Sequence, residues 1–424
     1  MDLPRGMRDI ETKECATIEY VRQKFIETSN LFGFQFMEPS PIELVSVIET
    51  KSGPSIKNEI YYFKDKGDRE VALRFDFTIG LTRYAVSQKS MRLPAKFSTF
   101  GGVWRYDEPQ KGRYRFFHQW DIEIYGEPNT ESDAEIIDFA SKFFSNLKLQ
   151  NITIDICDRV LIESYVKDIF KTDSAEEIGD ILRAVDKVQK KRRSEIIKEY
   201  QEKGYSTNDL EQILDFSQIK GTPQEIEKQI DTTKLKNWSK ILQLFESLKN
   251  RRVENVRVNF GIVRGLDYYS GIVFEIFDNS SDLGALVGGG RYDTLTKAFG
   301  RNDMGATGAA GGIERIVHSI EMQGIADLTN KDQIWVVYVN DEMKKIAINT
   351  ASALRFKGIS VEVDLGGKSL RKQMDMASNS KYVIIVAPKE YSEKSVLVRN
   401  MKDGSEKQVK LESILNDPRA NLQF

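Results

Sequence analysis

The chain has 424 residues, of which 40% are apolar and 30% charged, and its net charge is −2. This length predicts two or three packed domains, and the near-neutral charge excludes a polyanion-binding surface that covers the whole chain. The two cysteines and two histidines are too dispersed for a structural zinc site or a Ser–His–Asp triad. We find no uncharged apolar stretch long enough to span a membrane, so we expect a cytoplasmic protein without a membrane partner.

The first section of the chain, to about residue 165, begins with a helical pattern over 11–31 and continues with short runs typical of strands. The run VALRFDFTIG at 71–80 predicts a strand that carries Arg74, Asp76 and Thr78 on one face, because strand side chains alternate. The runs AKFSTFGGVWRYDE and YRFFHQWDIEIYG follow, and they predict a long antiparallel hairpin whose turn is PQKGR.

The turn end of this hairpin, WRYDEPQKGRYR at 104–115, is both basic and aromatic. By itself it is compatible with a nucleic-acid contact, a nucleotide pocket or a solvated turn. Arg105 can present a planar fork to a phosphate. Asp107, two residues further, faces the same way and can accept a hydrogen bond from an exocyclic amine.

The return strand of the hairpin places Gln119, Asp121 and Glu123 on one face, again by alternation. A row of acceptors beside cations suits a zwitterionic substrate that is bound next to a phosphate. Ordinary cross-strand pairs on a solvated surface are the alternative interpretation.

Charged helical sequence fills residues 166–248 and predicts a small helical insertion. Ser174-x-x-Glu177 fits a capping box, and Thr222-Pro223-x-Glu225 marks another helix start with proline in the first turn. We interpret these charges mainly as a solvated surface. Contact with a partner is the less favoured alternative.

Glycines and strand-like runs return at 255–325. In VRGLDYYSG, Arg264 precedes a glycine, where the backbone can approach a ligand closely, and Tyr268 and Tyr269 offer rings and hydroxyls. GAAGGIER predicts a buried Gly/Ala-rich strand that leads into a helix with Arg315 near its start. VGGGRYD is neither a Walker A loop nor a dinucleotide-binding fingerprint, because GK[ST] and a helix-opening G-x-G-x-x-G are missing.

A polar linker at 326–332 precedes a region, 333–424, in which strand-like and helical patterns alternate. QIWVVYV, ISVEVDL and YVIIVAP predict strands, and the KDGS sequence at 402–405 predicts a hairpin turn. This region is therefore expected to be an α/β domain with a mixed sheet.

Arginines with acceptors beside them recur at four strands or strand ends, and glycines surround them. This pattern fits a phosphate-bearing nucleotide that is bound next to a small amino-containing substrate. Phosphoryl or adenylyl transfer needs cations on the charge that develops at phosphorus, and it needs no covalent nucleophile. The lack of an evident cysteine or histidine nucleophile agrees with that chemistry.

The chain resembles the class II aminoacyl-tRNA synthetases in three segments. FGGVWRYDEPQKGRYRFFHQWDIEIYG resembles their motif 2, GAAGGIERIVHSIE their motif 3, and GFQFMEPSPIEL their motif 1, with Pro41 or Pro39 at the dimer-forming position. VRGLDYYSG and LPRGMRDI are similar to stretches of the histidyl-tRNA synthetase family. The resemblance implies an α+β fold: an antiparallel sheet flanked by helices in a catalytic domain at 1–325, a helical insertion at 166–248 within it, and a C-terminal α/β anticodon-binding domain at 333–424.

The resemblance also implies roles toward ATP. Arg105 would hold the α-phosphate, and Asp107 would accept from the adenine amino group, one methylene shorter than the Glu usual in the class. Arg113 would bind the outer phosphates and Arg315 the γ-phosphate. Arg264 would act with Arg105 in catalysis, on the α-phosphate, at a place where many relatives use a metal ion.

Toward histidine, the resemblance implies an α-amino site and an imidazole site. The residues are Asp76, Thr78 and Gln119 for the amino group, and Glu123 and Tyr269 for the imidazole, with Tyr114 and Tyr268 beside them. The implied partners are ATP with Mg²⁺, L-histidine, tRNA(His) and a second copy of the chain in a homodimer. The number of magnesium ions stays open.

Two other classes of protein compete with this interpretation. A synthetase-like regulatory subunit of histidine biosynthesis would generally lack the C-terminal domain and the arginines at 105, 264 and 315, which are present here. A nucleic-acid-binding or sensor protein on the same fold would not need the Glu123–Tyr269 pair beside phosphate-binding arginines.

Overall fold

A nine-stranded, mostly antiparallel sheet organises the larger of the two compact units into which the chain divides, Met1–Ala326 and Asp327–Phe424. The computed structural model describes residues 2–108, 114–188, 191–263, 269–325 and 333–422, and the count of strands applies to these residues. The strands, in spatial order, are β1 (Gln35–Phe36), β5 (Ala95–Trp104), β6 (Phe116–Gly126), β12 (Gly305–Gly312), β11 (Ala285–Arg291), β10 (Ile272–Asp278), β7 (Ile152–Asp158), β9 (Val256–Asn259) and β8 (Lys220–Gly221).

The predicted hairpin is confirmed as strands β5 and β6. They pair antiparallel from Ala95–Tyr125 to Trp104–Phe116, and β12 pairs antiparallel with the other edge of β6. The Gly/Ala-rich run also forms the predicted strand, β12, and leads directly into helix α12 (Ile313–Met322).

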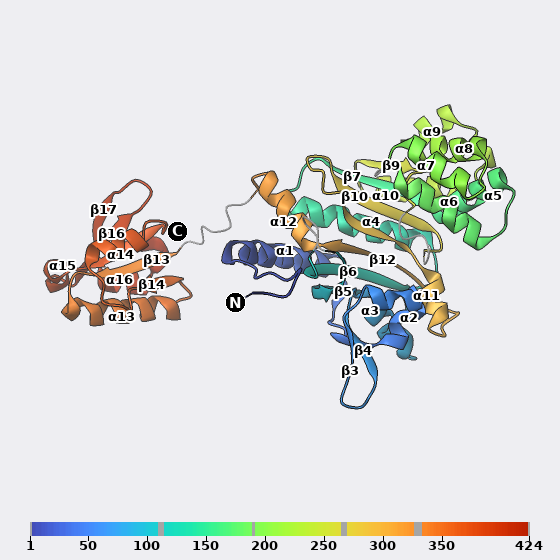
Figure 1. Cartoon of the computed structure of the whole chain (residues 1–424). Helices are drawn as coiled ribbons and strands as arrows, with labels where there is room; N and C mark the ends of the chain where they lie inside the picture. Colours follow the sequence, from blue (N-terminus) through green and yellow to red (C-terminus); the bar gives the residue numbers. More distant parts are fainter. Residues whose placement is uncertain (1, 109–113, 189–190, 264–268, 326–332, 423–424) are drawn as a thin grey trace. The chain divides into compact units, whose positions relative to one another are not determined.

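One face of the large sheet is covered by helices α1 (Thr12–Leu31), α4 (Thr130–Asn146) and α12 (Figure 1). The even-numbered side chains of β6 point to this face, and Trp120 packs against Phe25 and Phe143 at ring-centroid distances of 5.6 and 5.3 Å. This apolar layer leaves the odd-numbered side chains of β6 on the opposite face, which α3 (Thr78–Ser87) and α11 (Asp293–Ala298) cover at one end.

The prediction of one strand over 71–80 is wrong. Strand β4 (Glu70–Leu73) ends before Arg74, and helix α3 begins at Thr78. β4 is the middle strand of a small sheet with β2 (Ile42–Leu44) and β3 (Tyr62–Lys64), beside α2 (Val45–Ser52) and the 3₁₀ helix η1 (Pro54–Asn58). The Asp76 carboxylate accepts from the Ile79 amide at 3.3 Å, so this acid supports the first turn of α3 and does not belong to a strand.

Between strands β7 and β9 the chain is mainly helical. The helices are α5 (Arg159–Phe170), α6 (Ala175–Lys187), α7 (Arg193–Glu202), α8 (Thr207–Gln218), α9 (Pro223–Gln229), η2 (Thr232–Lys234) and α10 (Trp238–Asn250). The capping box of Thr222 and Glu225 is confirmed. At α6 only half of the predicted box forms, because Ser174 caps the Glu177 amide while the Glu177 carboxylate bonds the Thr172 hydroxyl.

The smaller unit has the mixed sheet that was predicted. Its strands, in spatial order, are β14 (Val361–Val363), β13 (Ile334–Tyr338), β15 (Tyr382–Val386), β16 (Ser395–Asn400) and β17 (Glu406–Lys410). Strands β14, β13 and β15 are parallel to one another, and β16 and β17 extend the sheet as antiparallel strands. The helices are α13 (Asp341–Phe356), α14 (Leu370–Met376), α15 (Pro388–Ser392), α16 (Leu411–Asn416) and α17 (Pro418–Asn421). Among the described residues, no helix is long and apolar enough to cross a membrane.

A buried glutamine ties α14 to β13 in the smaller unit. Gln373 is fully buried; its Oε1 accepts from the Tyr338 amide at 3.1 Å, and its Nε2 donates to the carbonyls of Tyr338 and Lys368 at 3.1 and 2.7 Å. The Tyr338 hydroxyl donates to the Asp364 carboxylate at 2.8 Å, and burial together with that acid raises the pKa of Tyr338 to about 12.

We predict that Gln373→Leu lowers the free energy of unfolding of the smaller unit by about 3 kcal/mol, because it leaves buried backbone groups without partners. Hydrogen exchange of the amides of β13 and β15 measures this loss. The matched control is Gln408→Leu, whose exposed amide bonds Glu393 at 2.9 Å and whose loss should cost less than about 1 kcal/mol. Equal losses in the two variants would contradict the prediction.

Candidate functional site

The predicted row of acceptors on β6 is present and buried. The side chains of Gln119, Asp121 and Glu123 are 4%, 0% and 1% exposed and lie on the face opposite the helical layer. Gln119 Nε2 donates to Asp121 Oδ1 at 2.7 Å, and the Thr78 hydroxyl lies 3.4 Å from Asp121 Oδ2. Although Thr78 is on a helix and not on a strand, the fold therefore brings it to the same acceptors.

Glu123 is bonded by a tyrosine that the sequence analysis did not select. The Tyr292 hydroxyl donates to Glu123 Oε2, and burial together with this acid raises the pKa of Tyr292 well above its ordinary value. Arg291, the preceding residue, anchors the end of β11 by donating to Asp133 at 2.7 Å and to the Asn129 carbonyl at 2.8 Å. The available signal was the tyrosine after the arginine in VGGGRYD, a run that had been compared only with a Walker A loop and a dinucleotide-binding fingerprint.

Glycines on β12 and β11 make room for the side chains over the sheet. Gly308 pairs with Glu123, and a Cβ at Gly308 would lie 1.5 Å from Glu123 Oε2. A Cβ at Gly290, which pairs with Gly308, would lie 3.1 Å from the ring of Tyr269. Glu123 and Tyr269 thus lie over paired glycines on one face of the sheet.

Open space adjoins this filled part of the floor. A Cβ at Gly288 or at Gly312 would meet no described atom within 4 Å. Gly312 pairs with Gln119, and Gly288 pairs with the half-buried Glu275 of β10. The described side chains therefore fill the floor around Glu123 and Tyr269 and leave space beside Gln119, and we call this space the pocket.

Two cations border the pocket at the Gln119 end of the sheet. Arg105 Nη2 donates to Gln119 Oε1 at 3.2 Å, its Nε donates to the Phe75 carbonyl at 3.0 Å, and its guanidinium lies 5.1 Å from the centre of the Phe117 ring. Arg315, in the first turn of α12, donates from Nη1 to the Ala285 carbonyl at 2.6 Å. Both arginines are half-buried, so their charges act in a partly dry environment.

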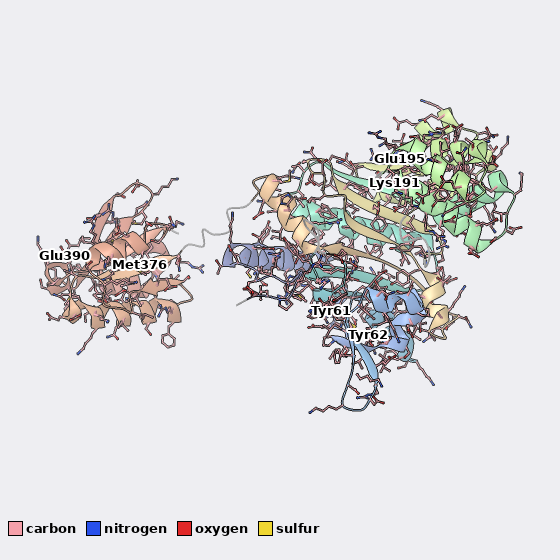
Figure 2. The ribbon with its side chains drawn as sticks, viewed as in Figure 1. Tyr61, Tyr62, Lys191, Glu195, Met376 and Glu390 are labelled. Carbon is pink, nitrogen blue, oxygen red and sulfur yellow. The ribbon has the colours of Figure 1, made fainter. Side chains whose placement is uncertain are left out.

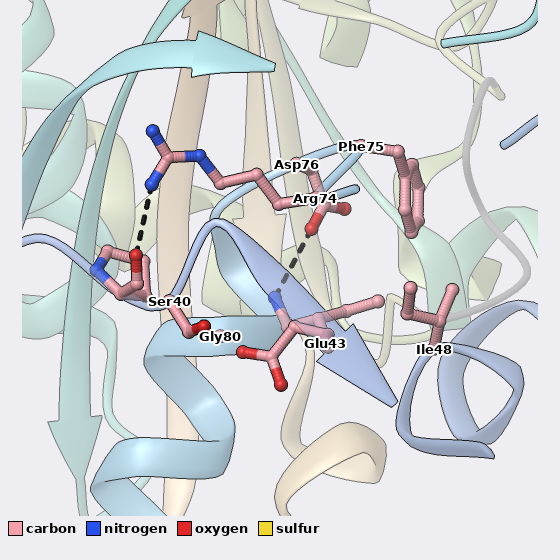
Figure 3. Close-up of a pocket in the computed structure, with 9 residues that line it drawn as sticks. Ser40, Glu43, Ile48, Arg74, Phe75, Asp76 and Gly80 are labelled. Carbon is pink, nitrogen blue, oxygen red and sulfur yellow. Dashed lines mark hydrogen bonds between the residues drawn. The ribbon is translucent and has the colours of Figure 1, made fainter. Parts of the chain in front are cut away.

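A Cβ at Gly101, which pairs with Gln119, would lie 3.2 Å from Arg74 Nη2, so Arg74 lies over the Gln119 face of the large sheet. It does so from the segment between β4 and α3 and not from the predicted strand over 71–80. Figure 3 shows its guanidinium turned toward the chain around Ser40 and away from Asp76. It donates to the carbonyls of Pro39 and Gly102 at 3.0 and 2.9 Å, and it is only 6% exposed. Arg74 therefore braces the surrounding backbone, whereas Asp76 supports the start of α3 through the Ile79 amide.

The remaining predicted site residues lie at the turn of the hairpin or outside the described residues. Asp107 and Tyr114 are half-buried and flank the turn, and Tyr114 contacts Arg8 at the opposite end of β6 from Glu123. Arg113, Arg264 and Tyr268 lie outside the residues that the structure describes.

The arrangement has cations at one end and a buried acid at the other. An anionic group fits beside Arg105 and Arg315, and a small donor-bearing group fits against Glu123, Tyr269 and Tyr292. A ligand with an amino group between these two ends meets Gln119, Asp121 and Thr78.

Comparisons with known proteins agree with this geometry. The histidyl-tRNA synthetase family matches residues 6–316, and the anticodon-binding domain family matches residues 333–417. The histidine–tRNA ligase of Pyrococcus furiosus is 34% identical over 422 residues, which cover 97% of both chains. That of Pyrococcus horikoshii is 33% identical over 423 residues, again with 97% of both chains covered.

Solved structures share the fold over nearly the whole chain. The histidyl-tRNA synthetase of Nostoc sp. PCC 7120 superposes with a TM-score of 0.82 at 21% identity, covering 99% of both chains. A Bacillus halodurans protein described as an ATP phosphoribosyltransferase regulatory subunit/histidyl-tRNA synthetase gives 0.75 at 22% identity, covering 91% of this chain and 98% of that one.

The antiparallel sheet flanked by helices, with an anticodon-binding domain after it, is the fold of a class II aminoacyl-tRNA synthetase, and the α+β prediction is confirmed. Within that class, the match over residues 6–316 and the relatives that align over nearly the full length identify the family. The chain belongs to the histidyl-tRNA synthetase family.

We predict that Tyr292→Phe lowers the free energy of unfolding of the larger unit by about 2 kcal/mol, because the lost hydrogen bond ends on a buried carboxylate. Urea denaturation followed by tryptophan fluorescence measures the change. Tyr125→Phe is the matched comparison, since the Tyr125 hydroxyl is also buried but bonds only neutral hydroxyls, those of Thr82, at 3.0 Å, and Tyr292. A smaller loss at Tyr292 than at Tyr125 would contradict the prediction.

Proposed function

We propose that this chain is a histidine–tRNA ligase. In the first step a histidine carboxylate oxygen attacks the α-phosphorus of ATP, the bond to the bridging oxygen breaks, and pyrophosphate leaves with the electron pair. In the second step a hydroxyl of the terminal ribose of tRNA(His) attacks the activated carbonyl and AMP leaves. The observation that carries the proposal is the buried Glu123, bonded by Tyr292 and bordered by Tyr269 on a floor of glycines.

Glu123 selects the imidazole of histidine in this proposal. A carboxylate has about four lone-pair sites, so Glu123 can accept from a ring N–H in addition to Tyr292. Tyr269 contacts the other side of the ring, with Tyr268 and Tyr114 beside the substrate. The α-amino group meets Asp76, Thr78 and Gln119, and the bond from Gln119 to Asp121 supports that arrangement.

ATP lies at the arginine end of the pocket. Arg105 holds the α-phosphate, Arg113 and Arg315 hold the outer phosphates, and Asp107 accepts from the adenine amino group. Arg264 stabilises the charge that develops on the α-phosphate during attack, so catalysis comes mainly from positioning and from fixed cations. The half-burial of Arg105 and Arg315 supports this, because a partly dry cation stabilises developing negative charge more strongly.

Magnesium accompanies ATP in the proposal. Among the described residues no group of three or more His, Cys, Asp or Glu side chains could hold a metal ion. This fits a magnesium ion that is bound chiefly by substrate phosphates and water, as is usual for this cation. When bound, it neutralises phosphate charge.

The domains divide the recognition of tRNA(His). The region 333–424 reads the anticodon, which the family match at 333–417 supports. The region 1–325 carries the chemistry, the segment 326–332 links the two, and the insertion at 166–248 contacts the tRNA.

A homodimer is also part of the proposal. On the small sheet, Ile42 and Leu44 of β2 and Phe63 of β3 are 43%, 44% and 45% exposed. The register of Leu44 and Phe63 with Val71 puts them on the same face, opposite the buried Glu43. Such an exposed apolar face suits a partner surface, and Ile42 and Leu44 lie in the segment that resembles motif 1.

Aminoacylation of total tRNA with labelled histidine tests the proposed function. We expect histidine to be esterified to tRNA(His) alone, in the presence of ATP and Mg²⁺. A regulatory subunit or a nucleic-acid-binding protein would attach no histidine to tRNA, and that result would contradict the proposal.

We predict that Glu123→Gln lowers kcat/KM for histidine in ATP–pyrophosphate exchange by about 100-fold, because the imidazole loses its charged acceptor. The KM for ATP should change by less than about threefold, since Glu123 lies at the other end of the pocket. Glu127→Gln, an exposed acid just beyond β6, is the control and should leave both constants unchanged. Wild-type behaviour of Glu123→Gln would exclude its role in specificity.

We predict that Ile42→Asp and Leu44→Asp convert the dimer into a monomer, because each places a charge in the apolar contact. Sedimentation velocity measures the species. Leu242→Asp is the control, as Leu242 of α10 is 37% exposed and lies on a different element. A wild-type chain that sediments as a monomer would contradict the dimer.

A further inference from the structure

The segment before α1 packs against the turn end of the β5–β6 hairpin. The Arg115 amide donates to the Gly6 carbonyl at 3.0 Å, and Arg115 Nη1 donates to the Arg5 carbonyl at 3.2 Å. These bonds join two parts of the chain that are more than a hundred residues apart. Neither this segment nor Arg115 has a role in the proposed catalysis.

Arg115 connects this segment to the residues proposed to bind ATP. Its carbonyl accepts from the Arg105 amide at 2.9 Å, and its Nε donates to the Asp107 carbonyl at 3.2 Å. Its guanidinium also lies 3.9 Å from the centre of the Tyr106 ring, which packs edge-on against Tyr61, labelled in Figure 2. Arg115 is only 8% exposed, so it is an internal connector and not a surface cation.

Arg8 makes the second connection. Its guanidinium lies 4.1 Å from the centre of the Tyr114 ring and pairs bidentately with Glu14 at the start of α1. The pair with Glu14 raises the pKa of Arg8, and Tyr114 and Glu314 add to the effect. Glu314 accepts from the His118 amide at 2.8 Å and precedes Arg315 in α12.

The end of the hairpin that follows the turn is therefore held from outside the hairpin, and Arg115 connects that hold to the end that precedes the turn. A long hairpin without such contacts would lose conformational freedom at its turn when ATP binds, and this loss would weaken binding. Contacts that hold the hairpin before ATP arrives reduce that entropic cost and so improve the affinity for ATP. Arg105 and Asp107 lie just before the turn and Tyr114 and Arg115 just after it, so one brace acts on both sides.

We propose that residues 5–8, together with Arg115, are a positioning element that holds Arg105 and Asp107 in place for ATP. Arg8 and Arg115 are positioning residues, because they contact the residues around ATP and not ATP itself. The inference rests on the proposed function, since Arg105 and Asp107 are ATP ligands only within it.

Two truncations of the full chain, each starting with methionine, test the element. Deletion of residues 2–4 leaves every contact above in place, whereas deletion of residues 2–8 removes the brace. In histidine-dependent ATP–pyrophosphate exchange, we expect the shorter deletion to match the wild type within about twofold. The longer deletion should raise the KM for ATP about tenfold and leave the KM for histidine within about threefold.

Point variants separate positioning from folding. Arg115→Lys keeps the charge but loses the planar fork, so it should also raise the KM for ATP about tenfold. Arg8→Gln should do so less strongly. Arg5→Ala should change nothing, because the Arg5 carbonyl makes the contact and its side chain, 74% exposed, forms only a surface pair with Glu108. If the longer deletion does not fold, these variants decide the question.

Hydrogen exchange of the peptide 104–116 gives a readout that does not depend on activity. Its amides should exchange at least tenfold faster in Arg115→Lys and in the longer deletion than in the wild type, without ligand. Unchanged exchange, or an unchanged KM for ATP in an active enzyme, would overturn the positioning element. A wild type that performs no exchange of pyrophosphate would instead overturn the proposed function, and the hydrogen exchange would still decide the inference.

Discussion

A carboxylate that is buried on the face of the large sheet constrains the residues around it. Glu123 is almost fully buried, and an ionised acid in such a place is stable only with donors around it and with room for its side chain. Tyr292 supplies a donor, and Gly308 supplies the room, because any Cβ there would overlap the carboxylate. Gly308 is therefore explained by the carboxylate, whereas Gly311 of the same strand makes room for Trp120.

The two faces of the large sheet have different structural roles. Trp120 and the other even-numbered residues of β6 are locked into an aromatic layer with α1 and α4, which fixes the strand's position and rotation. Because strand side chains alternate, that same packing aims Gln119, Asp121 and Glu123 at the pocket. A rigid apolar layer beneath a polar row is what allows the row to remain ordered before a ligand arrives.

Several parts of the pocket come from segments that are distant along the chain. Thr78 reaches Asp121 from the first turn of α3, Arg315 comes from the first turn of α12, and the segment before α1 braces the hairpin through Arg115. Each of these contributions comes from the start of a helix or the stretch before one. The same pocket therefore depends on helix starts as well as on strands.

Elements whose sequence patterns are local could be predicted from the sequence alone. The hairpin, the polar row of β6, the strand leading into α12 and the mixed sheet of the smaller unit all follow from alternation, turn residues and helix-start signals, which act within a few residues. The strand expected over 71–80 failed for the same reason: alternation alone could not show that Arg74 finds its partners at Pro39 and Gly102, or that Asp76 supports a helix. The bond from Tyr292 to Glu123 and the bonds from Arg115 to Arg5 and Gly6 could not be predicted in this way. They join segments that are far apart in the chain, so they depend on how the sheet and its neighbours pack, and no local pattern records that packing.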